Sequence, residues 1–528
     1  MPSDLPIVYV RGYAGPASGI DRQVDDPFYG FNAGATHVRA NGDGEPVFYQ
    51  FESPLLRLIS DEDYRVIVQG DQRALLLTDG PPLPAKTIWI HRFYDYAATT
   101  FGTSVAPRPE EFDIERAADR LYDFILDIRR RTGAPRVFLV AHSMGGLVCR
   151  CMMQKLCGQR HSDGKVRLPA TEIVDRLFTW ATPHRGIEFD AGGGLLDWAM
   201  ETFGPAGSDI FSPAGMRRYL VPDGVDDDGD WLPNEIPGSV FPIDRVFCAV
   251  GTDAQDYGVV EKVVGPKSDG LVHIENAYCV QLDGGQARAA HRAFVHRSHS
   301  GRYGIVNSEE GYQNLRRFLF GRYQASADLV GLRLPADDGR EKRSWQADVR
   351  LSVRGLPIVM HEQLAAHYCP VQLSKEAELG AAPDDPDTPV PLVSTFLLDS
   401  SRSAIPGTAA PANSRYTLSI KVFHLSEVHG TFFWQHHLEQ VADWEDILIV
   451  DVGRRDHDDP SVLRAWATWN SSVAGPIDDF DPATQGQDPL SFTHEGEALV
   501  AHAAIPEVGQ AILGRGTARM RLTVQVQT

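Results

Sequence analysis

The segment that most constrains the fold is VFLVAHSMGGLV, at residues 137–148. Its first five residues form an apolar run typical of a buried strand, and the glycines after the serine open a helix. Ser143 lies where strand and helix meet, and Ala141 and Gly145 on either side are small enough to let the two elements almost touch. The segment therefore predicts a strand, a sharp turn that presents the Ser143 hydroxyl, and a helix. The alternative is an ordinary strand–helix turn with a capping serine.

Strands and helices alternate through the first part of the chain. Apolar runs of strand length predict core strands at residues 7–10, 87–91, 136–140, 176–180 and 245–250. Apolar residues at helical spacing predict helices over residues 114–130 and 309–320, the second with Ser308 as its N-cap. This alternation is typical of an α/β fold with a doubly wound, mostly parallel sheet.

Residues 187–242 break this pattern and lie between two predicted core strands, where a lid or cap would be inserted. The apolar residues of its first half could form one face of a helix: Leu195, Leu196, Trp198, Met200 and Phe203. The acidic run at residues 223–230 lacks the spacing of a calcium-binding loop. We expect a solvated lid loop there, with calcium binding as the alternative.

The pattern of apolar and polar residues changes again after residue 322. Apolar and polar residues alternate at residues 345–353, 416–422 and 520–526, as in half-exposed antiparallel strands. We therefore expect two domains, a catalytic domain at residues 1–323 and an all-β, sandwich-like domain at residues 324–528.

Composition restricts the partners of this chain. Its 528 residues carry a net charge of −21, whereas nucleic-acid binding relies on clustered Lys and Arg, so we expect no nucleic-acid partner. The six cysteines follow no framework spacing, and Cys149 and Cys151 are expected to be buried free thiols. We expect neither a metal nor a cofactor. No leader segment opens the chain and no apolar run is long enough to cross a bilayer. A cytoplasmic protein is expected, with signal-less export left open.

Ser143 needs partners to act as a nucleophile. A serine hydroxyl requires a histidine that takes its proton and a carboxylate that orients the imidazole. After a serine turn of this kind, the acid and then the histidine follow later in the chain. Asp269 lies at a tight turn before an apolar pair, and His299 lies in a Ser-Gly-rich loop. We predict a catalytic triad of Ser143, Asp269 and His299.

Other residues compete for two of these roles. Asp253 and Asp256 follow the strand predicted at residues 245–250 and could replace Asp269. His291 and His296 lie near His299 in the sequence and could replace it.

An oxyanion hole needs two backbone N–H groups directed at the developing negative charge. The residue after the nucleophile, Met144, is expected to supply one of them. The loop after the first strand is expected to supply the other from Tyr13, since Gly12 lets the chain turn back closely. The alternative is a plain glycine turn after the first strand.

Four segments together resemble the lipase and esterase branch of the α/β-hydrolases, in particular lipases of the type that includes the GPI inositol-deacylases. They are residues 8–15, 140–146, 179–186, and 268–272 taken together with His299. In the serine turn, Ala141 stands where the usual G-x-S-x-G pattern has glycine. In the oxyanion loop, Arg11 stands where such lipases usually have histidine. The resemblance implies that His184, in the Thr-Pro-His motif, has a structural role.

The resemblance and the predicted triad lead to the same function. We expect a serine hydrolase that cleaves carboxylic esters, of lipids or other acyl compounds, through an acyl-enzyme. The alternatives are an acyltransferase with the same triad and a non-catalytic binding module on a hydrolase fold. The expected partner is a small-molecule or lipid ester, with contact to a lipid interface through the lid or the C-terminal domain. The oligomeric state is left open.

Overall fold

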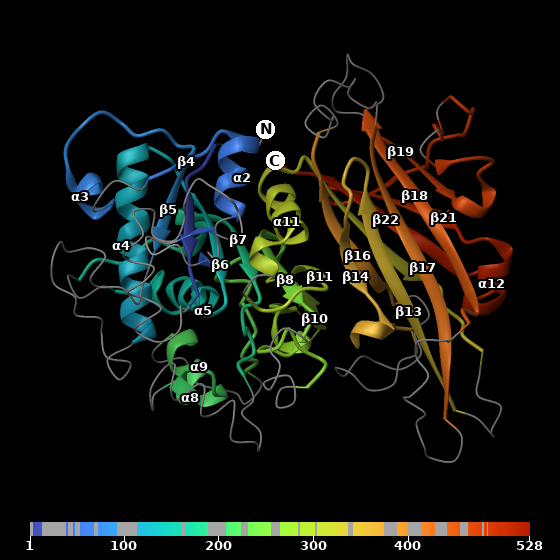
Figure 1. Cartoon of the computed structure of the whole chain (residues 1–528), viewed down its shortest axis with the longest axis horizontal. Helices are drawn as coiled ribbons and strands as arrows, with labels where there is room; N and C mark the ends of the chain where they lie inside the picture. The colour runs from blue at the N-terminus through green and yellow to red at the C-terminus, as the bar shows by residue number, and fades with distance from the viewer. Residues whose placement is uncertain are drawn as a thin grey trace. The chain divides into compact units, whose positions relative to one another are not determined.

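The computed structural model of the chain is shown in Figure 1. It describes residues 4–12, 39–40, 46–47, 53–67, 72–91, 113–160, 164–187, 207–222, 231–254, 265–283, 286–300, 304–335, 342–373, 388–399, 413–427, 441–454, 463–477, 480–482 and 484–527. The chain divides into two compact units, one of Ser3–Leu315 and one that holds Arg316–Thr528. The domain border at residue 323 stays a prediction.

A seven-stranded sheet forms the centre of the first unit. Its strands, in spatial order, are β11 (His291–Val295), β8 (Val246–Gly251), β7 (Val174–Trp180), β6 (Val137–His142), β1 (Ile7–Val10), β5 (Thr87–His91) and β4 (Arg65–Val66). Every neighbouring pair is parallel. Strands β1, β5, β6 and β8 are buried along their whole length, which explains why they are continuous apolar runs in the sequence.

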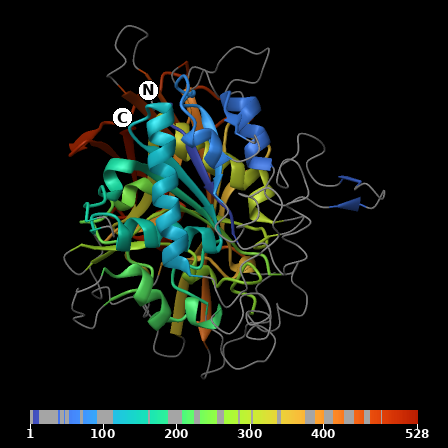
Figure 2. The same cartoon turned by 90° about the vertical axis from the view of Figure 1, so that its left-hand side faces the viewer.

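Helices cover this sheet. Helix α4 (Ile114–Thr132) lies across one face (Figure 2) and begins at Asp113, whose Oδ1 accepts hydrogen bonds from two first-turn amides. It ends at Gly133, whose φ of 71° closes the helix in the left-handed region. The other helices of this unit within the described residues are α2 (Ser53–Glu62), α3 (Gln72–Leu77), α5 (Met144–Cys151), α6 (Ala170–Ile173), α8 (Gly207–Ile210) and α9 (Pro213–Leu220). Helix α11 (Glu309–Phe320) spans the border of the two units.

The first unit also contains two short antiparallel pairs and several single turns of helix. The pairs are β2 (Arg39–Ala40) with β3 (Pro46–Val47), and β9 (Val280–Asp283) with β10 (Gln286–Ala289). A π-helical turn at Met152–Leu156 continues α5, and 3-10 turns lie at Ile243–Arg245, Ile274–Asn276 and Ile305–Asn307.

The strand order determines where a site can form. Strand β1 lies between β5 and β6. The next two strands of this sheet in the sequence, β4 and β5, lie on one side of β1, and β6 and the later strands lie on the other, so the strand order reverses at β1. In sheets of this type, the crevice at the carboxyl ends of the strands at such a reversal is the usual place for a ligand. Val10 pairs with Ala141, which brings the residues after β1 next to Ser143.

The predicted lid lies only partly within the described residues. Helices α8 and α9 belong to it, and Ser212 caps α9 by accepting a hydrogen bond from the Gly215 amide. The apolar stretch at residues 195–203 and the acidic run at residues 223–230 lie outside the described residues, so the helix face and calcium predictions stay open.

The second unit is a β-sandwich. One antiparallel sheet has the order β16 (Val390–Leu397), β12 (Tyr323–Val330), β22 (Arg519–Val526), β21 (Ala498–Ala504) and β20 (Thr493–Glu495). The other has the order β14 (Val359–Gln363), β13 (Lys342–Val353), β17 (Asn413–Glu427), β18 (Trp444–Arg454) and β19 (Leu463–Trp469), with β15 (Val371–Gln372) also paired to β13. The described part of this unit also contains a helix, α12 (Glu507–Leu513), and 3-10 turns at Ala365–His367 and Asn470–Ser472.

One apolar core joins the two sheets of the sandwich. Along β12, buried and half-buried residues alternate, as expected for a strand with one face on the core. Ala325 and Leu329 from β12 and Leu418 and Ile420 from β17 belong to the same buried cluster. The two sheets therefore pack face to face, and the prediction of an α/β-hydrolase-type sheet followed by an all-β domain is confirmed.

Strand boundaries differ slightly from those predicted. The strand predicted at residues 136–140 is β6, Val137–His142, which continues to the residue before Ser143. Of the strands in the seven-stranded sheet, β4 and β11 were not predicted from the sequence. In the described part of the chain, no helix has the length and apolar character needed to cross a membrane.

Candidate active site

Ser143 occupies a strained turn between β6 and α5. Its backbone has φ 52° and ψ −130°, a combination that non-glycine residues rarely adopt. The Ser143 amide donates to the carbonyl of Trp180, 2.9 Å away. Gly145 is required two residues later, because a Cβ atom there would lie 2.4 Å from the Val10 carbonyl oxygen. This close approach of α5 to the end of β1 fixes the turn.

The structure brings the three predicted triad residues together. His299 Nε2 lies 2.9 Å from Ser143 Oγ, and His299 Nδ1 lies 2.9 Å from Asp269 Oδ2. The Asp269 and His299 side chains are buried, at 1% and 4% exposure, whereas Ser143 is half-buried. The hydroxyl is thus the member of the set that a substrate reaches.

Backbone hydrogen bonds orient the acid and the base. Asp269 Oδ1 accepts from the amides of Leu271 and Val272 at 3.0 and 2.7 Å, which leaves Oδ2 directed at the histidine. The His299 amide donates to the Asp269 carbonyl at 2.8 Å. The sequence suggested a flexible loop around His299, but the residue is buried in a turn that Asp269 holds.

The competing candidates lie elsewhere. Asp253 Oδ2 is 3.9 Å from His296 Nε2, so these two residues contact each other. His291 lies on β11, and burial lowers its pKa to about 4. Asp256 lies outside the described residues. The geometry therefore favours Asp269 and His299 over the alternatives within the described part of the chain.

Part of the predicted oxyanion hole is described. Met144 is the first residue of α5, so its N–H has no acceptor inside the helix and faces the N-terminal end. The positive end of the helix dipole favours a developing negative charge at the same place. Gly12 lies against the turn at Ser143. A Cβ atom added at Gly12 would lie 2.8 Å from His142 Nδ1. Tyr13 lies outside the described residues, so its role stays a prediction.

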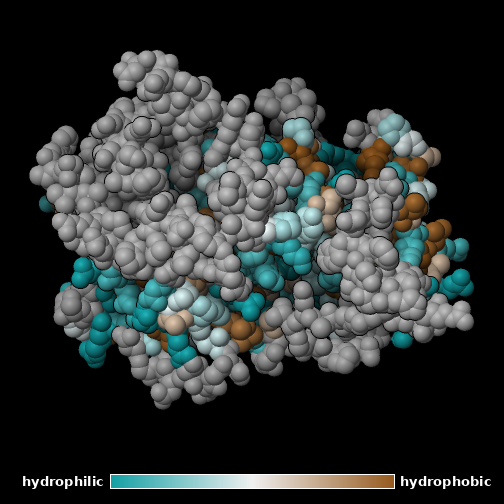
Figure 3. All heavy atoms as spheres, turned by 60° about the horizontal axis from the view of Figure 1, so that its bottom comes forward, coloured by the Kyte–Doolittle hydropathy of each residue, from teal (hydrophilic) through white to brown (hydrophobic). Residues whose placement is uncertain are grey.

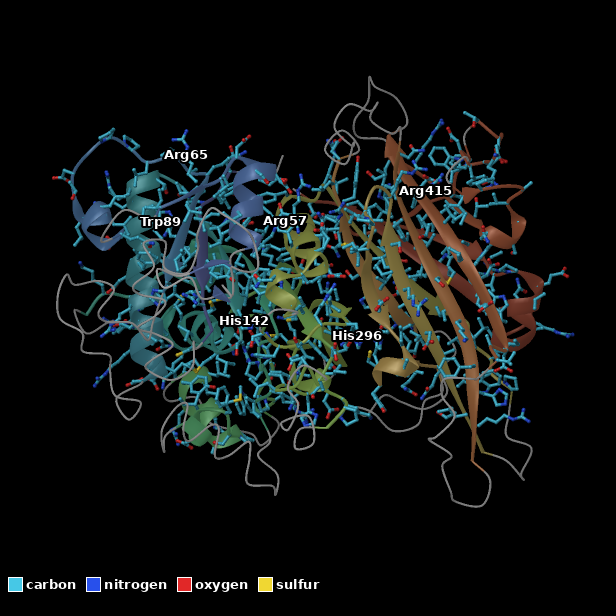
Figure 4. All side chains as sticks on the ribbon, in the orientation of Figure 1. Arg57, Arg65, Trp89, His142, His296 and Arg415 are labelled. Atoms are coloured by element: carbon cyan, nitrogen blue, oxygen red, sulfur yellow. The ribbon has the colours of Figure 1, made fainter. Side chains whose placement is uncertain are left out.

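His142, labelled in Figure 4, is a contact that sequence reasoning missed. Its Nε2 donates to the His299 carbonyl oxygen, 3.0 Å away, and the two imidazole rings lie 5.1 Å apart. Burial, with further contributions from His299 and Arg11, holds the pKa of His142 well below its usual range. A neutral imidazole therefore supports the turn that carries His299. In the sequence, the position of His142 directly before Ser143 indicates that it lies near the site.

The turn after β7 also supports the nucleophile. Thr182 Oγ1 donates to the Ser143 carbonyl oxygen at 2.9 Å. Two residues on, His184 is fully buried, and its Nε2 lies 3.1 Å from Thr179 Oγ1. Within the described residues, His184, Cys248 and Cys279 form a group that could hold a metal ion, and none of the triad residues belongs to it.

This arrangement can perform nucleophilic catalysis. A hydroxyl within hydrogen-bond reach of an imidazole, which is in turn held by a buried carboxylate, can pass its proton to the imidazole as it attacks an electrophilic carbon. The site lies at the carboxyl ends of β1 and β6, where the strand order predicts a ligand crevice.

Comparison with known proteins gives one family. The model of the family described as "Putative serine esterase (DUF676)" matches residues 99–204, a range that contains Ser143. No curated protein matches the chain. The family match supports the lipase and esterase branch of the α/β-hydrolases, as the sequence predicts, and it supports ester hydrolysis as the general activity.

Several solved structures are similar at low identity. Mature lipase BlEst2 from Bacillus licheniformis is 16% identical with a TM-score of 0.28, and the match covers 60% of this chain and 92% of that one. Phospholipase PlaB from Legionella pneumophila is 14% identical with a TM-score of 0.32, covering 80% and 90%. Staphylococcus hyicus lipase is 13% identical with a TM-score of 0.23, covering 58% and 89%. TM-scores this low carry no argument, so the fold rests on the strand order and the turn at Ser143.

Proposed function

We propose that this chain is a serine hydrolase that cleaves carboxylic esters through an acyl-enzyme on Ser143. The observation that carries the proposal is the chain of contacts from Ser143 Oγ through the His299 ring to Asp269, with both links at 2.9 Å. Asp269 accepts a hydrogen bond at Oδ2, so His299 carries its proton on Nδ1 and presents a lone pair at Nε2. That tautomer is the one that a general base for the serine requires.

The reaction then takes two steps. Ser143 Oγ attacks the ester carbonyl carbon while His299 Nε2 takes the hydroxyl proton, and the imidazolium gives that proton to the departing alcohol. Water then attacks the acyl-serine, with His299 again taking and returning a proton, which frees the acid and restores Ser143. Buried Asp269 stabilises the imidazolium in both steps.

Negative charge on the carbonyl oxygen needs donors in both steps. The Met144 amide at the start of α5 is one, and the Tyr13 amide is the proposed second. Removing one such donor costs about 3–4 kcal/mol of barrier in enzymes of this chemistry.

The lipid or acyl character of the substrate rests on the resemblance of the motif segments to lipases. The surface of the described residues gives no further support for a lipid substrate. Large exposed apolar residues are scattered in both units, and Figure 3 shows the coloured hydrophobic residues of one face in small groups between hydrophilic ones. Lipid-interface contact through the lid or the second unit therefore stays a proposal.

The test is hydrolysis of short p-nitrophenyl esters by the wild type and by Ser143→Ala. The variant is expected to lose at least a thousandfold in kcat, since the nucleophile is absent. Ser60→Ala serves as a matched control, because Ser60 is an exposed serine on α2 that hydrogen-bonds only locally. A fluorophosphonate probe should label Ser143 in the wild type and in the control. Unchanged turnover in Ser143→Ala, or a label on another residue, would refute the proposal.

Product analysis distinguishes a hydrolase from the two alternatives, an acyltransferase and a non-catalytic binding module. With an added alcohol or lysolipid, an acyltransferase makes a new ester faster than free acid, whereas a hydrolase releases mainly acid. A non-catalytic binding module shows no turnover and no probe label.

A further inference from the structure

Three side chains of types that bind metals meet inside the first unit, and none of them belongs to the triad. They are His184, from the turn after β7, Cys248, on β8, and Cys279, just before β9. All three are buried, and their ligand atoms lie within 4.8 Å of one another. The three residues come from segments that are separate in the sequence, so the fold itself assembles the cluster.

The spacing fits a tetrahedral zinc site. With Zn–S bonds of about 2.3 Å and Zn–N bonds of about 2.0 Å, neighbouring sulfur and nitrogen ligands lie about 3.6 Å apart. His184 Nε2 and Cys248 Sγ are 3.7 Å apart. The Thr179 hydroxyl oxygen lies 3.1 Å from the same nitrogen and could occupy the fourth ligand position of the ion. Thr179 pairs with Cys248 across β7 and β8, which places both side chains on one face of the sheet.

The ring of His184 directs one nitrogen at the proposed metal position. Its Nε2 is the atom that contacts Cys248 Sγ, and its buried Nδ1 has no hydrogen-bond partner among the described residues. The ring is fully buried, and a neutral imidazole that carries its proton on Nδ1 presents the Nε2 lone pair to a cation.

A buried arginine supplies a reason for negative charge at the cysteines. The Arg150 guanidinium is fully buried and donates hydrogen bonds to neutral acceptors: Gln154 Oε1 and the carbonyls of His184, Pro233 and Glu235. Electrostatic interactions link this guanidinium to Cys279 and Cys248. A thiolate here offsets the buried positive charge.

We propose that His184, Cys248 and Cys279 form a structural site for a soft divalent cation, Zn²⁺. Zinc takes the Nε2 lone pair and both sulfurs, and each thiol releases its proton to solvent as its Zn–S bond forms. Two thiolates neutralise the ion, so the occupied site adds no net charge beside Arg150. This proposal replaces the sequence-based expectation of a metal-free chain and is independent of the proposed activity.

The ion would tie the turn after β7 to the sheet. That turn carries Thr182, whose hydroxyl donates to the Ser143 carbonyl. The site is buried and contains none of the triad residues, so its role would be to hold this turn in place.

The first test measures the metal in the whole wild-type chain. Protein expressed with added zinc and purified without chelator is expected to hold about one zinc ion per chain by plasma mass spectrometry. After zinc removal and loading with Co²⁺, tetrahedral thiolate coordination is expected to give a sulfur-to-cobalt charge-transfer band and intense visible bands. Chelation should lower Tm, and added zinc should restore it. Substoichiometric zinc, below about a tenth, together with no thiolate–cobalt band, would overturn the proposal.

Variants locate the ion. Cys248→Ala and Cys279→Ala are each expected to lower the zinc content about tenfold or more. Cys149→Ala is the matched control, because Cys149 is equally buried on α5 but lies outside the cluster, and it should keep its zinc. Equal metal content in the control and in both cluster variants would overturn the site.

A disulfide is the competing use of the two cysteines. Intact mass and peptide mapping of protein lysed with a thiol-blocking reagent should show Cys248 and Cys279 unlinked, whereas a Cys248–Cys279 disulfide in that protein would overturn the zinc site. If the variants fail to fold, the wild-type metal content and cobalt spectrum still decide the question.

Discussion

Asp269 holds His299 twice, through its side chain and through its backbone. Oδ2 lies 2.9 Å from His299 Nδ1, and the Asp269 carbonyl accepts the His299 amide at 2.8 Å. The backbone bond survives any change of the side chain, so the two effects of the acid, on position and on charge, can be tested separately.

Asp269→Asn should therefore leave the turn folded and still remove most of the activity. An amide at this position favours the wrong tautomer of the imidazole and leaves the imidazolium uncompensated, and kcat is expected to fall about four orders of magnitude. Steady-state kinetics on a p-nitrophenyl ester measures the effect. Asp253→Asn is the control, because Asp253 contacts His296, and it should retain nearly full activity. The reverse result would assign the acid to Asp253.

Gly145→Ala should disturb the turn at Ser143. The added methyl would lie 2.4 Å from the Val10 carbonyl oxygen, so α5 or β1 must move. A loss of about 1–3 kcal/mol in the free energy of unfolding is expected, together with a large drop in kcat. Gly80→Ala is the comparison, since its Cβ would meet only the end of the Arg131 side chain at 3.4 Å. Equal stability and activity in the two variants would show that the close approach does not matter.

Buried His91 should make the first unit sensitive to acid. Burial lowers its pKa from 6.5 to about 4, so between these values the unfolded chain binds a proton that the folded chain does not. The stabilisation is present above pH 6.5 and is lost as the pH falls toward 4, by up to about 3 kcal/mol for this residue.

Replacing His91 by Gln, which does not titrate, is expected to flatten this dependence. Urea unfolding at several pH values between 7 and 4.5 measures the slope. An unchanged slope in His91→Gln would mean that other groups cause the acid sensitivity.

The second unit contains a buried ion pair whose loss should be costly. Arg415, labelled in Figure 4, binds both carboxylate oxygens of Asp451 at 2.9 and 2.8 Å, and the two side chains are 5% and 2% exposed. Arg415→Met leaves the Asp451 charge buried alone, and a loss of about 3–5 kcal/mol in the free energy of unfolding is expected.

Arg350→Met tests the specificity of that result. Arg350 is 54% exposed and lies 3.9 Å from Glu362, so its loss should cost less than about 1 kcal/mol. Similar losses in the two variants, measured by urea unfolding, would show that burial of the Arg415 pair has no special weight.

The sequence allowed the sheet of the first unit to be predicted because its central strands are buried on both faces and appear as unbroken apolar runs. The triad could be predicted because the chemistry restricts the residue types and their order, and because a strained turn needs small neighbours such as Gly145. The predicted alternation in β13, β17 and β22 similarly reflects one face on the core and one face in solvent.

Contacts between distant segments could not be predicted in this way. His142 reaches the His299 carbonyl across 157 residues; its position before Ser143 indicates that it lies near the site, but nothing in the sequence identifies its hydrogen-bond partner. The meeting of His184 with Cys248 and Cys279 likewise depends on how β7, β8 and β9 lie in space. The short edge strand β4, with only Arg65 and Val66, has too few residues to give a periodic pattern.

The backbone at Ser143 also limits which residue types can replace it. At a φ of 52°, a side chain branched at Cβ meets the neighbouring carbonyl, so threonine would be strained here despite its hydroxyl group. Cysteine has the same unbranched shape as serine and avoids that conflict. An engineered nucleophile at position 143 can therefore be the thiol of cysteine, but not the secondary alcohol of threonine.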